Sequence, residues 1–166
     1  STTNDNHVWY STDIGGSAGY LRASTTDSLI ATGGQQPLEF NSNGFTMPVK
    51  AYYDRLNDNG YTFASWTFRK QPGFFDVVTY TGNGGTSQTI NHNLGSVPGM
   101  IIVKATNSAK NWEVFHRSLG NTKALFLNLT SAENTGTGHW NDTDPTSTDF
   151  TVGSFSNVNE NGTTYV

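Results

Sequence analysis

Cysteine is absent from this chain of 166 residues, so disulfides and cysteine-based zinc sites are excluded. Charged residues make up only 13% of the sequence, against an ordinary share of about 25%. The formal net charge is -4 and no basic stripe is present, so nucleic-acid binding lacks the positive surface that it needs. No apolar run approaches the length of about 20 residues that a membrane-spanning helix requires. Small domains must therefore be held by packing, association or neighbouring units.

Aromatic side chains are the main resource for a hydrophobic core. Hydrophobic residues account for 34% of the chain, while Phe, Tyr and Trp alone account for 13%. A few large rings can fill a thin core, because each buries a large area. The polar remainder is mostly Thr, Ser, Asn and Gly, which favours short strands and turns over long helices.

Nearly the same segment occurs twice in the chain. Gly16 matches Gly120 at an offset of 104 residues, Phe45 matches Phe150 at 105, and Gly60 matches Gly162 at 102. Offsets this steady indicate a duplicated unit of roughly 100 residues, the size of one small domain. Residues 75–105 have no counterpart before Trp9, and residues 64–70 have none after Val166.

The repeat predicts two domains, residues 1–72 and residues 73–166. The first unit is expected to lack its N-terminal strands and the second its last strand, as in an excerpt from a longer tandem array. We expect the first unit to be completed by upstream sequence or by a neighbouring chain.

Short strands are predicted throughout. Residues 63–69 alternate with period two, and the Asn59-Gly60 turn before them is a hairpin signal that Asn161-Gly162 repeats. Further strands are expected at residues 74–81, 88–91, 100–104, 112–116, 124–129 and 150–152. The continuous apolar run at 100–104 predicts a strand covered on both faces. Residues 131–149 are expected to be a loop, with a helical turn only at 131–134.

About seven strands per unit predict an all-β fold. Short strands separated by turns are typical of an antiparallel β-sandwich, of the jelly-roll or concanavalin-like kind.

Several long motifs resemble one protein family. They are WTFRKQPGFFDVVTYTGNG, HNLGSVPGMIIVK, FHRSLG, WNDTDPTSTDFTVG and NVNENGTTYV. They resemble a repeat domain of bacteriophage tail-fibre and virion proteins, especially those of marine phages. The resemblance covers residues 64–166 closely and 9–63 more loosely. It implies a concanavalin-like sandwich and a structural role in the virion, and it carries no catalytic or binding residues.

The loop around Trp140 is the candidate ligand site. Trp140 and His139 stand beside Asn141, Asp142 and Asp144, and the stretch has no equivalent in the first copy. An exposed ring flanked by hydrogen-bonding groups is what a glycan-binding loop requires. The alternatives are that Trp140 anchors the loop on its own domain and that the acidic residues are turn-forming. With Asp149, the same carboxylates would suit a calcium ion, but no calcium-loop spacing is present.

No catalytic motif is recognisable. The histidines form no metal-binding pair, His92 is interpreted as a turn residue, and no GxSxG surrounds the serine near His116. The remaining tryptophans, Trp9, Trp66 and Trp112, are predicted to be core residues. The polar cluster Asp54, Asn57, Asp58 and Asn59 is interpreted as turn-forming.

These observations lead to one hypothesis and one alternative. The hypothesis is a non-enzymatic virion structural module of a tail fibre, appendage or capsid surface, used for assembly and display and for host attachment. Its partners would be copies of itself, other virion proteins or a host glycan, with no cofactor, metal, nucleic acid or membrane insertion. The alternative is a lectin-like domain that binds host glycans. A glycan-degrading enzyme has no support beyond fold analogy.

Overall fold

The computed structural model describes residues 6–14, 19–32, 38–47, 56–57 and 59–166. Every strand pair in these ranges is antiparallel, and helices are limited to single turns. The prediction of an all-β fold is confirmed.

The second unit is built on a sheet with strand order β11-β10-β9-β8. Its strands are β8 (Met100–Val103), β9 (Glu113–His116), β10 (Lys123–Phe126) and β11 (Asn134–Thr135). The apolar runs in β8 and β9 pair along their length, with Ile102 opposite Val114 and Ile101 opposite Phe115. Such β-branched and aromatic cross-strand pairs stabilise a sheet.

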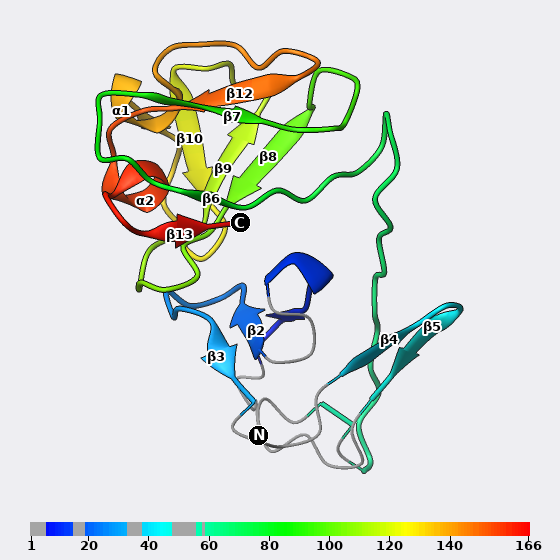
Figure 1. Cartoon of the computed structure of the whole chain (residues 1–166). Coiled ribbons are helices and arrows are strands. Elements are labelled where there is room, and N and C mark those ends of the chain that lie inside the picture. The colour runs from blue at the N-terminus through cyan, green and yellow to red at the C-terminus, as the bar shows by residue number, and fades with distance from the viewer. Residues whose placement is uncertain (1–5, 15–18, 33–37, 48–55, 58) are drawn as a thin grey trace.

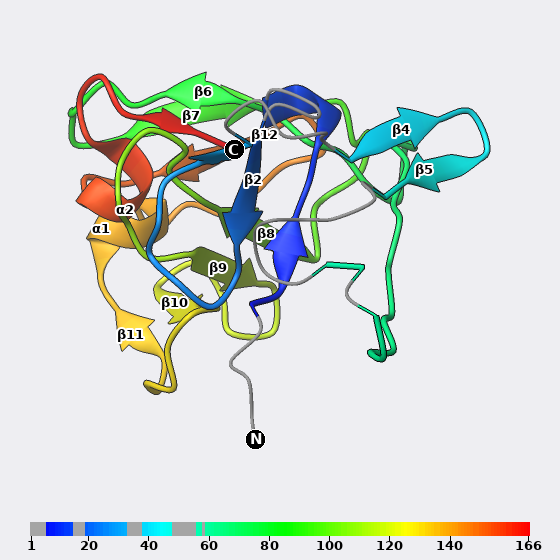
Figure 2. The same ribbon diagram turned by 90° about the horizontal axis from the view of Figure 1, so that it is seen from below.

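A second layer lies across this sheet. It consists of β7 (Gln88–Asn91) paired with β12 (Asp149–Val152), and of β6 (Tyr80–Thr81) paired with β13 (Thr164–Tyr165). Figures 1 and 2 show β6 and β7 over one face of β8 to β10. Between the layers lies the main core, which includes Ile90, Val103, Phe115, Trp140, Val152 and Tyr165.

The predicted strands of this unit are confirmed with adjusted ends. The segment 88–91 keeps its predicted bounds as β7, whereas the strand expected at 74–81 is reduced to β6. The expectation that 100–104 is covered on both faces holds in its middle, because Ile101 packs on the main core and Ile102 on a second cluster. Met100 remains 57% exposed.

The helical turn expected at 131–134 is wrong. Helical turns instead form at α1 (Thr137–Trp140) and α2 (Ser156–Asn159), and residue 134 begins β11. The position of α1 depends on two glycines that it packs against or contains. A side chain at Gly138 would overlap the ring of Phe155, and a side chain at Gly153 would overlap the carbonyl oxygen of Thr137. Two glycines thus allow the turn to lie directly on the chain after β12.

The described part of the first unit repeats the sheet of the second. Its strands β1 (Val8–Trp9), β2 (Gly19–Arg22) and β3 (Ile30–Ala31) form a sheet in the order β1-β2-β3. Val8 pairs with Arg22 in the first unit, and Glu113 pairs with Phe126 in the second. Glu113 follows Val8 by 105 positions, and Phe126 follows Arg22 by 104. Gly19 pairs with Ala31, as Lys123 pairs with Thr135, both at an offset of 104. The two sheets therefore share both sequence spacing and register.

A second element of the first unit also has a counterpart. The hairpin of β4 (Glu39–Asn41) and β5 (Gly44–Thr46) pairs Asn41 with Gly44. Thr146 and Asp149 follow Asn41 and Gly44 by 105 positions. The N–H of Thr146 donates to the carbonyl oxygen of Asp149 at 2.8 Å, which closes the turn before β12.

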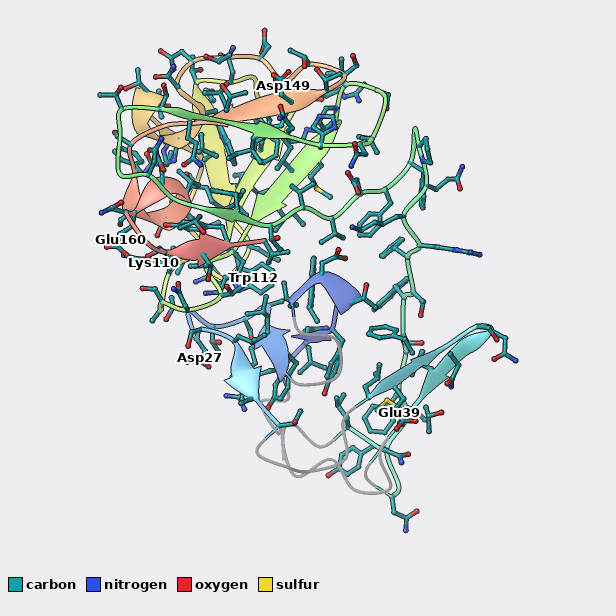
Figure 3. All side chains as sticks on the ribbon, viewed as in Figure 1. Asp27, Glu39, Lys110, Trp112, Asp149 and Glu160 are labelled. Atoms are coloured by element: carbon teal, nitrogen blue, oxygen red, sulfur yellow. The ribbon has the colours of Figure 1, made fainter. Side chains whose placement is uncertain are left out.

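Trp112 joins the two units. It forms a cluster with Ile14 of the 3-10 helix η1 (Thr12–Ile14) and Leu21 of β2, which Leu29, Ile102 and Val166 extend. Its indole Nε1 donates to the carbonyl oxygens of Arg22 at 3.0 Å and Thr25 at 3.1 Å. Figure 3 shows Trp112 between the two bodies. The core prediction is confirmed for Trp112. It is wrong for Trp9, which lies edge-on against Trp112 and is 42% exposed.

The strand predicted at residues 63–69 is not formed. Residues 61–70 carry no strand assignment and are all exposed, so the core prediction for Trp66, which is 75% exposed, is also wrong. The preceding turn does form, since Gly60 has a φ of 87° and its counterpart Gly162 a φ of 75°. In Figure 1 the ribbon here runs alone, so the alternating pattern lacks a sheet to join. The predicted division near residue 72 falls on the turn closed by Gln71 and Phe75 and stays a prediction.

Lys104 supplies a titratable contact between the units. Its side chain is fully buried, and Nζ donates to the carbonyl oxygens of Thr26 at 3.0 Å and Lys110 at 2.9 Å. Burial lowers its pKa from 10.5 to about 8, since the charged form loses hydration, although nearby Asp27 acts in the opposite direction.

Raising the pH should therefore stabilise the protein through Lys104. Between its folded pKa of about 8 and its unfolded value of 10.5, the folded state holds fewer protons, so the free energy of unfolding rises with pH. We expect a gain of about 1–2 kcal/mol from pH 8 to about pH 9.5, measured by urea denaturation. Lys104→Met should flatten this rise, while Lys123→Met, at a half-exposed site, should leave it unchanged. If the free energy of unfolding rises with pH as steeply in Lys104→Met as in the parent protein, Lys104 is not the group that titrates.

Candidate functional site

The predicted glycan-binding aromatic, Trp140, lies in the core. It ends α1 with 2% of its surface exposed, packs edge-on against Phe115 with ring centroids 5.8 Å apart, and donates from Nε1 to the carbonyl oxygen of Lys123 at 3.0 Å. No face of the ring is available to a sugar. The prediction of an exposed stacking residue here is wrong, and the alternative of a packed anchor is confirmed.

His139 is buried beside Trp140. Its Nδ1 makes a close contact with Oε1 of the buried Glu113, and its Nε2 lies 3.0 Å from Oδ1 of Asn134. The ring also meets Phe155 edge-on at 4.7 Å. These contacts tie α1 to β9 and β11, so His139 is a structural residue and not part of a ligand loop.

The other members of the predicted site remain on the surface. Asn141 and Asp142 adopt left-handed backbone conformations with φ of 52° and 49°, and Asn141 caps α1 through its N–H to Thr137 at 2.8 Å. Asp144 accepts from Asn121 Nδ2 at 2.9 Å. The turn-forming interpretation therefore describes Asn141 and Asp142. Within the described ranges, no group of three or more His, Cys, Asp or Glu side chains is placed to hold a metal.

Two other histidines bond to their own turns. His92 Nδ1 accepts from the N–H of Leu94 at 3.2 Å, which confirms its prediction as a turn residue. His116 Nδ1 accepts from the backbone N–H of Ser118 at 3.3 Å. The geometry does not direct the imidazole at the serine hydroxyl, as an activated nucleophile would need. Of the polar cluster at 54–59, Asn57 has a φ of 70° in a turn, while residues 54 and 58 lie outside the described residues.

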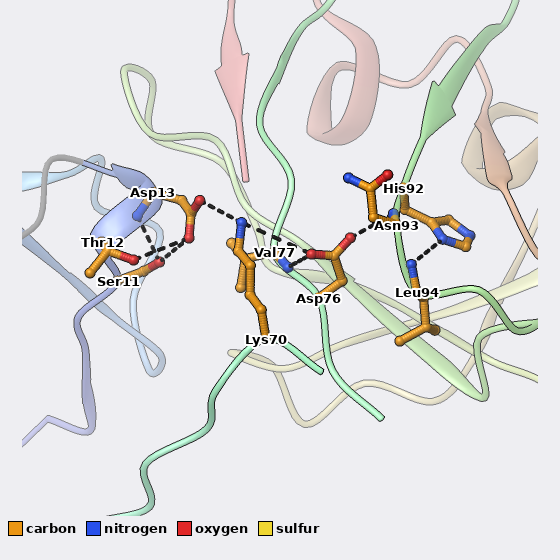
Figure 4. Close-up of polar contacts among 9 residues, drawn as sticks. All are labelled: Ser11, Thr12, Asp13, Lys70, Asp76, Val77, His92, Asn93 and Leu94. Carbon is orange, nitrogen blue, oxygen red and sulfur yellow. Dashed lines mark hydrogen bonds and ion pairs between the residues drawn. The ribbon is translucent and has the colours of Figure 1, made fainter. Parts of the chain in front are cut away.

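Sequence reasoning missed a polar link between distant segments. Lys70 Nζ lies 2.7 Å from Asp13 of the first unit and 3.9 Å from Asp76 of the second. Asp76 also accepts from the N–H of Asn93 at 2.8 Å, and Figure 4 shows the whole chain of contacts. Asp13 and Lys70 lie 57 positions apart in sequence, too far for any local motif to indicate their contact. Because Lys70 is exposed, the link orients the segments more than it stabilises them.

A small cavity lies between the units. Its volume is about 230 Å³, and it is lined mainly by Asp13, Ile14 and Leu29 from the first unit and by Thr79, Thr106 and Thr164 from the second. This is below the range of about 300–1,000 Å³ that is usual for small-molecule pockets. Two of its hydroxyl groups, those of Thr106 and Thr164, lie within hydrogen-bond distance of each other at 2.7 Å.

The most unusual surface is the aromatic segment, which we define as residues 61–70. Four exposed rings lie on it: Tyr61 is 50% exposed, Phe63 54%, Trp66 75% and Phe68 56%. Figure 3 shows side chains standing away from this ribbon. Contiguous exposed apolar side chains of this kind mark interaction surfaces.

An open strand edge lies elsewhere on the molecule. Among the described residues, β8 is the last strand of its sheet, and only β9 pairs along Met100–Val103. Met100 on β8 is 57% exposed and Val97 before it is 51% exposed. An edge with unpaired backbone groups is a template for another strand.

These features define an all-β protein in which the antiparallel sheet of one unit recurs in the other. Residues 1–166 match the family described as a domain of unknown function, DUF7483, and the chain belongs to that family. No curated protein and no solved structure matches the chain. In the part of the chain that the structure describes, no helix is long and apolar enough to cross a membrane.

Replacing Trp140 should damage stability. Trp140→Ala removes a buried ring and an indole hydrogen bond, and we expect it to lower the free energy of unfolding by about 3–5 kcal/mol. Phe40→Ala is the control, since this aromatic is 40% exposed on β4 and its loss should cost well under half as much. Urea denaturation followed by circular dichroism measures both. Equal small losses would contradict the buried placement of Trp140.

Proposed function

We propose that the chain is a non-enzymatic structural module of a bacteriophage virion. In this proposal it belongs to a tail fibre, an appendage or the capsid surface, where it serves assembly and display, with host attachment as a further role. We also propose that each complete unit is a β-sandwich of the jelly-roll or concanavalin-like kind. The motif resemblance to tail-fibre repeats suggests the virion setting.

The observation that carries the proposal is the repeated register. Two sheets with the same pairing pattern follow one another along the chain at offsets of 104 and 105. They are joined by apolar packing around Trp112 and by backbone bonds such as the N–H of Leu29 to Thr106 at 2.8 Å. Units that pack directly on their neighbours suit a protein that must span distance stiffly.

The ionisable side chains support a structural role. His139 and Glu113 are buried against each other, Asp13 and Asp76 both contact Lys70, and Lys110 pairs with Glu160 at 3.1 Å. Figure 3 shows Lys110 and Glu160 beside each other at the base of the second unit. Each of these groups ties one segment to another.

The lectin-like alternative depended on an exposed Trp140. Because that ring is packed against Phe115, the loop offers no aromatic platform for a pyranose face. The structural module is therefore the function that we propose.

Virus particles whose genome encodes this chain provide the test. If the chain is a virion component, its tryptic peptides, such as residues 111–117, should sediment with purified particles through a density gradient. Mass spectrometry should find them in constant ratio to a known capsid protein, while a phage replication enzyme is lost. Peptides found only in the soluble fraction of infected cells would refute the proposal.

A further inference from the structure

One turn of the first unit, residues 22–29, docks on the second unit. Side chains of the second unit donate hydrogen bonds to three of its backbone carbonyl oxygens, those of Arg22, Thr25 and Thr26. The donors are the indole of Trp112 and the side-chain nitrogen of Lys104. We call this contact the junction, and in Figure 1 it lies where the loop between β2 and β3 meets the second body. Two side chains of the second unit therefore hold the turn by its backbone.

The packing beside the junction is incomplete. The cavity of about 230 Å³ between the units is lined there by Asp13, Leu29 and Thr106. The ion pair of Lys70 with Asp13 also crosses between the units, but Lys70 is half-exposed, and exposed pairs contribute little stability. A boundary with a void and an exposed polar link opens at a lower free energy than a close-packed core. We therefore expect the junction to open before the second unit unfolds.

The docked turn buries the side chain of Lys104 completely. Among the described residues, two acceptors lie within hydrogen-bond distance of Nζ, the carbonyl oxygens of Thr26 in the first unit and Lys110 in the second. An ammonium group has three N–H donors, whereas a neutral amine has two, one for each of these carbonyls. The neutral amine thus makes the same two bonds without burying a charge. Burial accordingly lowers the pKa of Lys104 to about 8.

We propose that the first unit undocks reversibly at this junction and that Lys104 takes up a proton when it does. Undocking moves Thr26 away and lets water reach the side chain, so the cost of burying its charge disappears. The docked form is then favoured as the pH rises. This inference goes beyond the proposed structural role, because it gives the contact between the units a dependence on proton concentration. The docked form remains the major one, so the contact stays stiff most of the time.

The charged groups of the turn oppose this effect without cancelling it. Asp27 lies near Lys104 and favours the charged form. Its carboxylate is partly exposed and lies 3.4 Å from the guanidinium of Arg22. Burial is the larger influence on Lys104, since the net change in its pKa is downward.

The titratable groups of the second unit around Lys104 have partners of their own. Lys110 offers Lys104 a carbonyl oxygen, while its ammonium lies 3.1 Å from Glu160. On β13, the hydroxyl of Tyr165 donates to the carbonyl oxygen of Ser156 at 2.8 Å. We therefore assign the proton uptake to Lys104.

The sign and size of the effect follow from the two states of Lys104. Its pKa is about 8 in the docked form, and it returns to its ordinary 10.5 once the side chain is hydrated. Between these values the undocked form holds more protons, so raising the pH favours docking. The equilibrium constant for undocking should fall about tenfold from about pH 7 to about pH 9.

A cysteine placed at the junction measures undocking, because the chain has no other thiol. Leu21 is 1% exposed and packs against Trp112, so the thiol of Leu21→Cys should react with iodoacetamide when the junction opens. Its rate is divided by that of the same variant unfolded in urea at the same pH, which removes the titration of the thiol itself. We expect the protection to rise about tenfold from about pH 7 to about pH 9. Protection that does not change with pH would overturn the proposal.

Two further substitutions assign the effect to Lys104. Adding Lys104→Met to Leu21→Cys should hold the protection within about twofold over the same range, and a rise equal to that of Leu21→Cys alone would rule out Lys104 as the proton acceptor. Asp27→Asn keeps Lys104 and changes a partly exposed side chain, so it tests the assignment even if Lys104→Met does not fold. Because it removes a carboxylate that favours the charged form, the rise should be steeper. An unchanged rise would contradict the assignment.

A thiol in the main core distinguishes undocking from unfolding. Val152 is 0% exposed between the layers of the second unit, so Val152→Cys reports on the opening of that unit. We expect Leu21→Cys to react at least about tenfold faster than Val152→Cys at neutral pH, each rate again relative to the unfolded variant. Equal protection at the two positions would mean that the units open together, and the separate opening of the junction would be refuted.

Discussion

Tyr165 holds the second unit together. It lies fully buried between β6 and the chain after β8, pairing with Tyr80 on one side and bridging to Ala105 on the other. Its ring stacks on that of Tyr80 at 5.0 Å, its hydroxyl donates to the carbonyl oxygen of Ser156 at 2.8 Å and accepts from the N–H of Glu160 at 2.9 Å. Burial raises the pKa of both tyrosines, which keeps their hydroxyls protonated as donors. One short strand thus connects the two layers.

The same constraint explains why the first unit is open. Phe63 stands at the place in the repeat that Tyr165 occupies, yet it is 54% exposed. Among the described residues, no strand pairs with the aromatic segment. The sheet β1-β2-β3 of the first unit is held by Trp112 and Lys104 of its neighbour. Exposure of the segment follows from a missing partner and not from a polar sequence.

Local patterns in the sequence predicted several strands and turns correctly, although the helical turn expected at 131–134 was wrong. The β-branched run at 100–104 and the segment at 88–91 were predicted as strands, and His92 as a turn residue, because each depends on its immediate neighbours. Alternation at residues 63–69 indicated the potential to form a strand, but pairing requires an edge that no local pattern reveals. The strand was predicted and the partner was not.

The prediction of an exposed ligand-binding Trp140 was wrong for a related reason. Polar neighbours suggested an exposed Trp140, but Gly138 and Gly153 let α1 lie against the end of β12, which turns the indole inward. Those glycines act through contacts between segments, so their role shows only in the folded protein. The match of offsets between the two halves was the one long-range signal available, and it predicted a duplicated unit. The registers of β1-β2-β3 and β9-β10-β11 agree with those offsets.

Amide hydrogen exchange on dilute protein tests the central claim most directly. The claim is that equivalent backbone positions differ only in having or lacking a strand partner. Amides of Tyr165 and Val166 should exchange at least about a hundredfold more slowly than their intrinsic rates, while those of Phe63 and Ala64 should exchange almost as fast as in an unfolded peptide. Comparable protection at both pairs of positions would contradict the account.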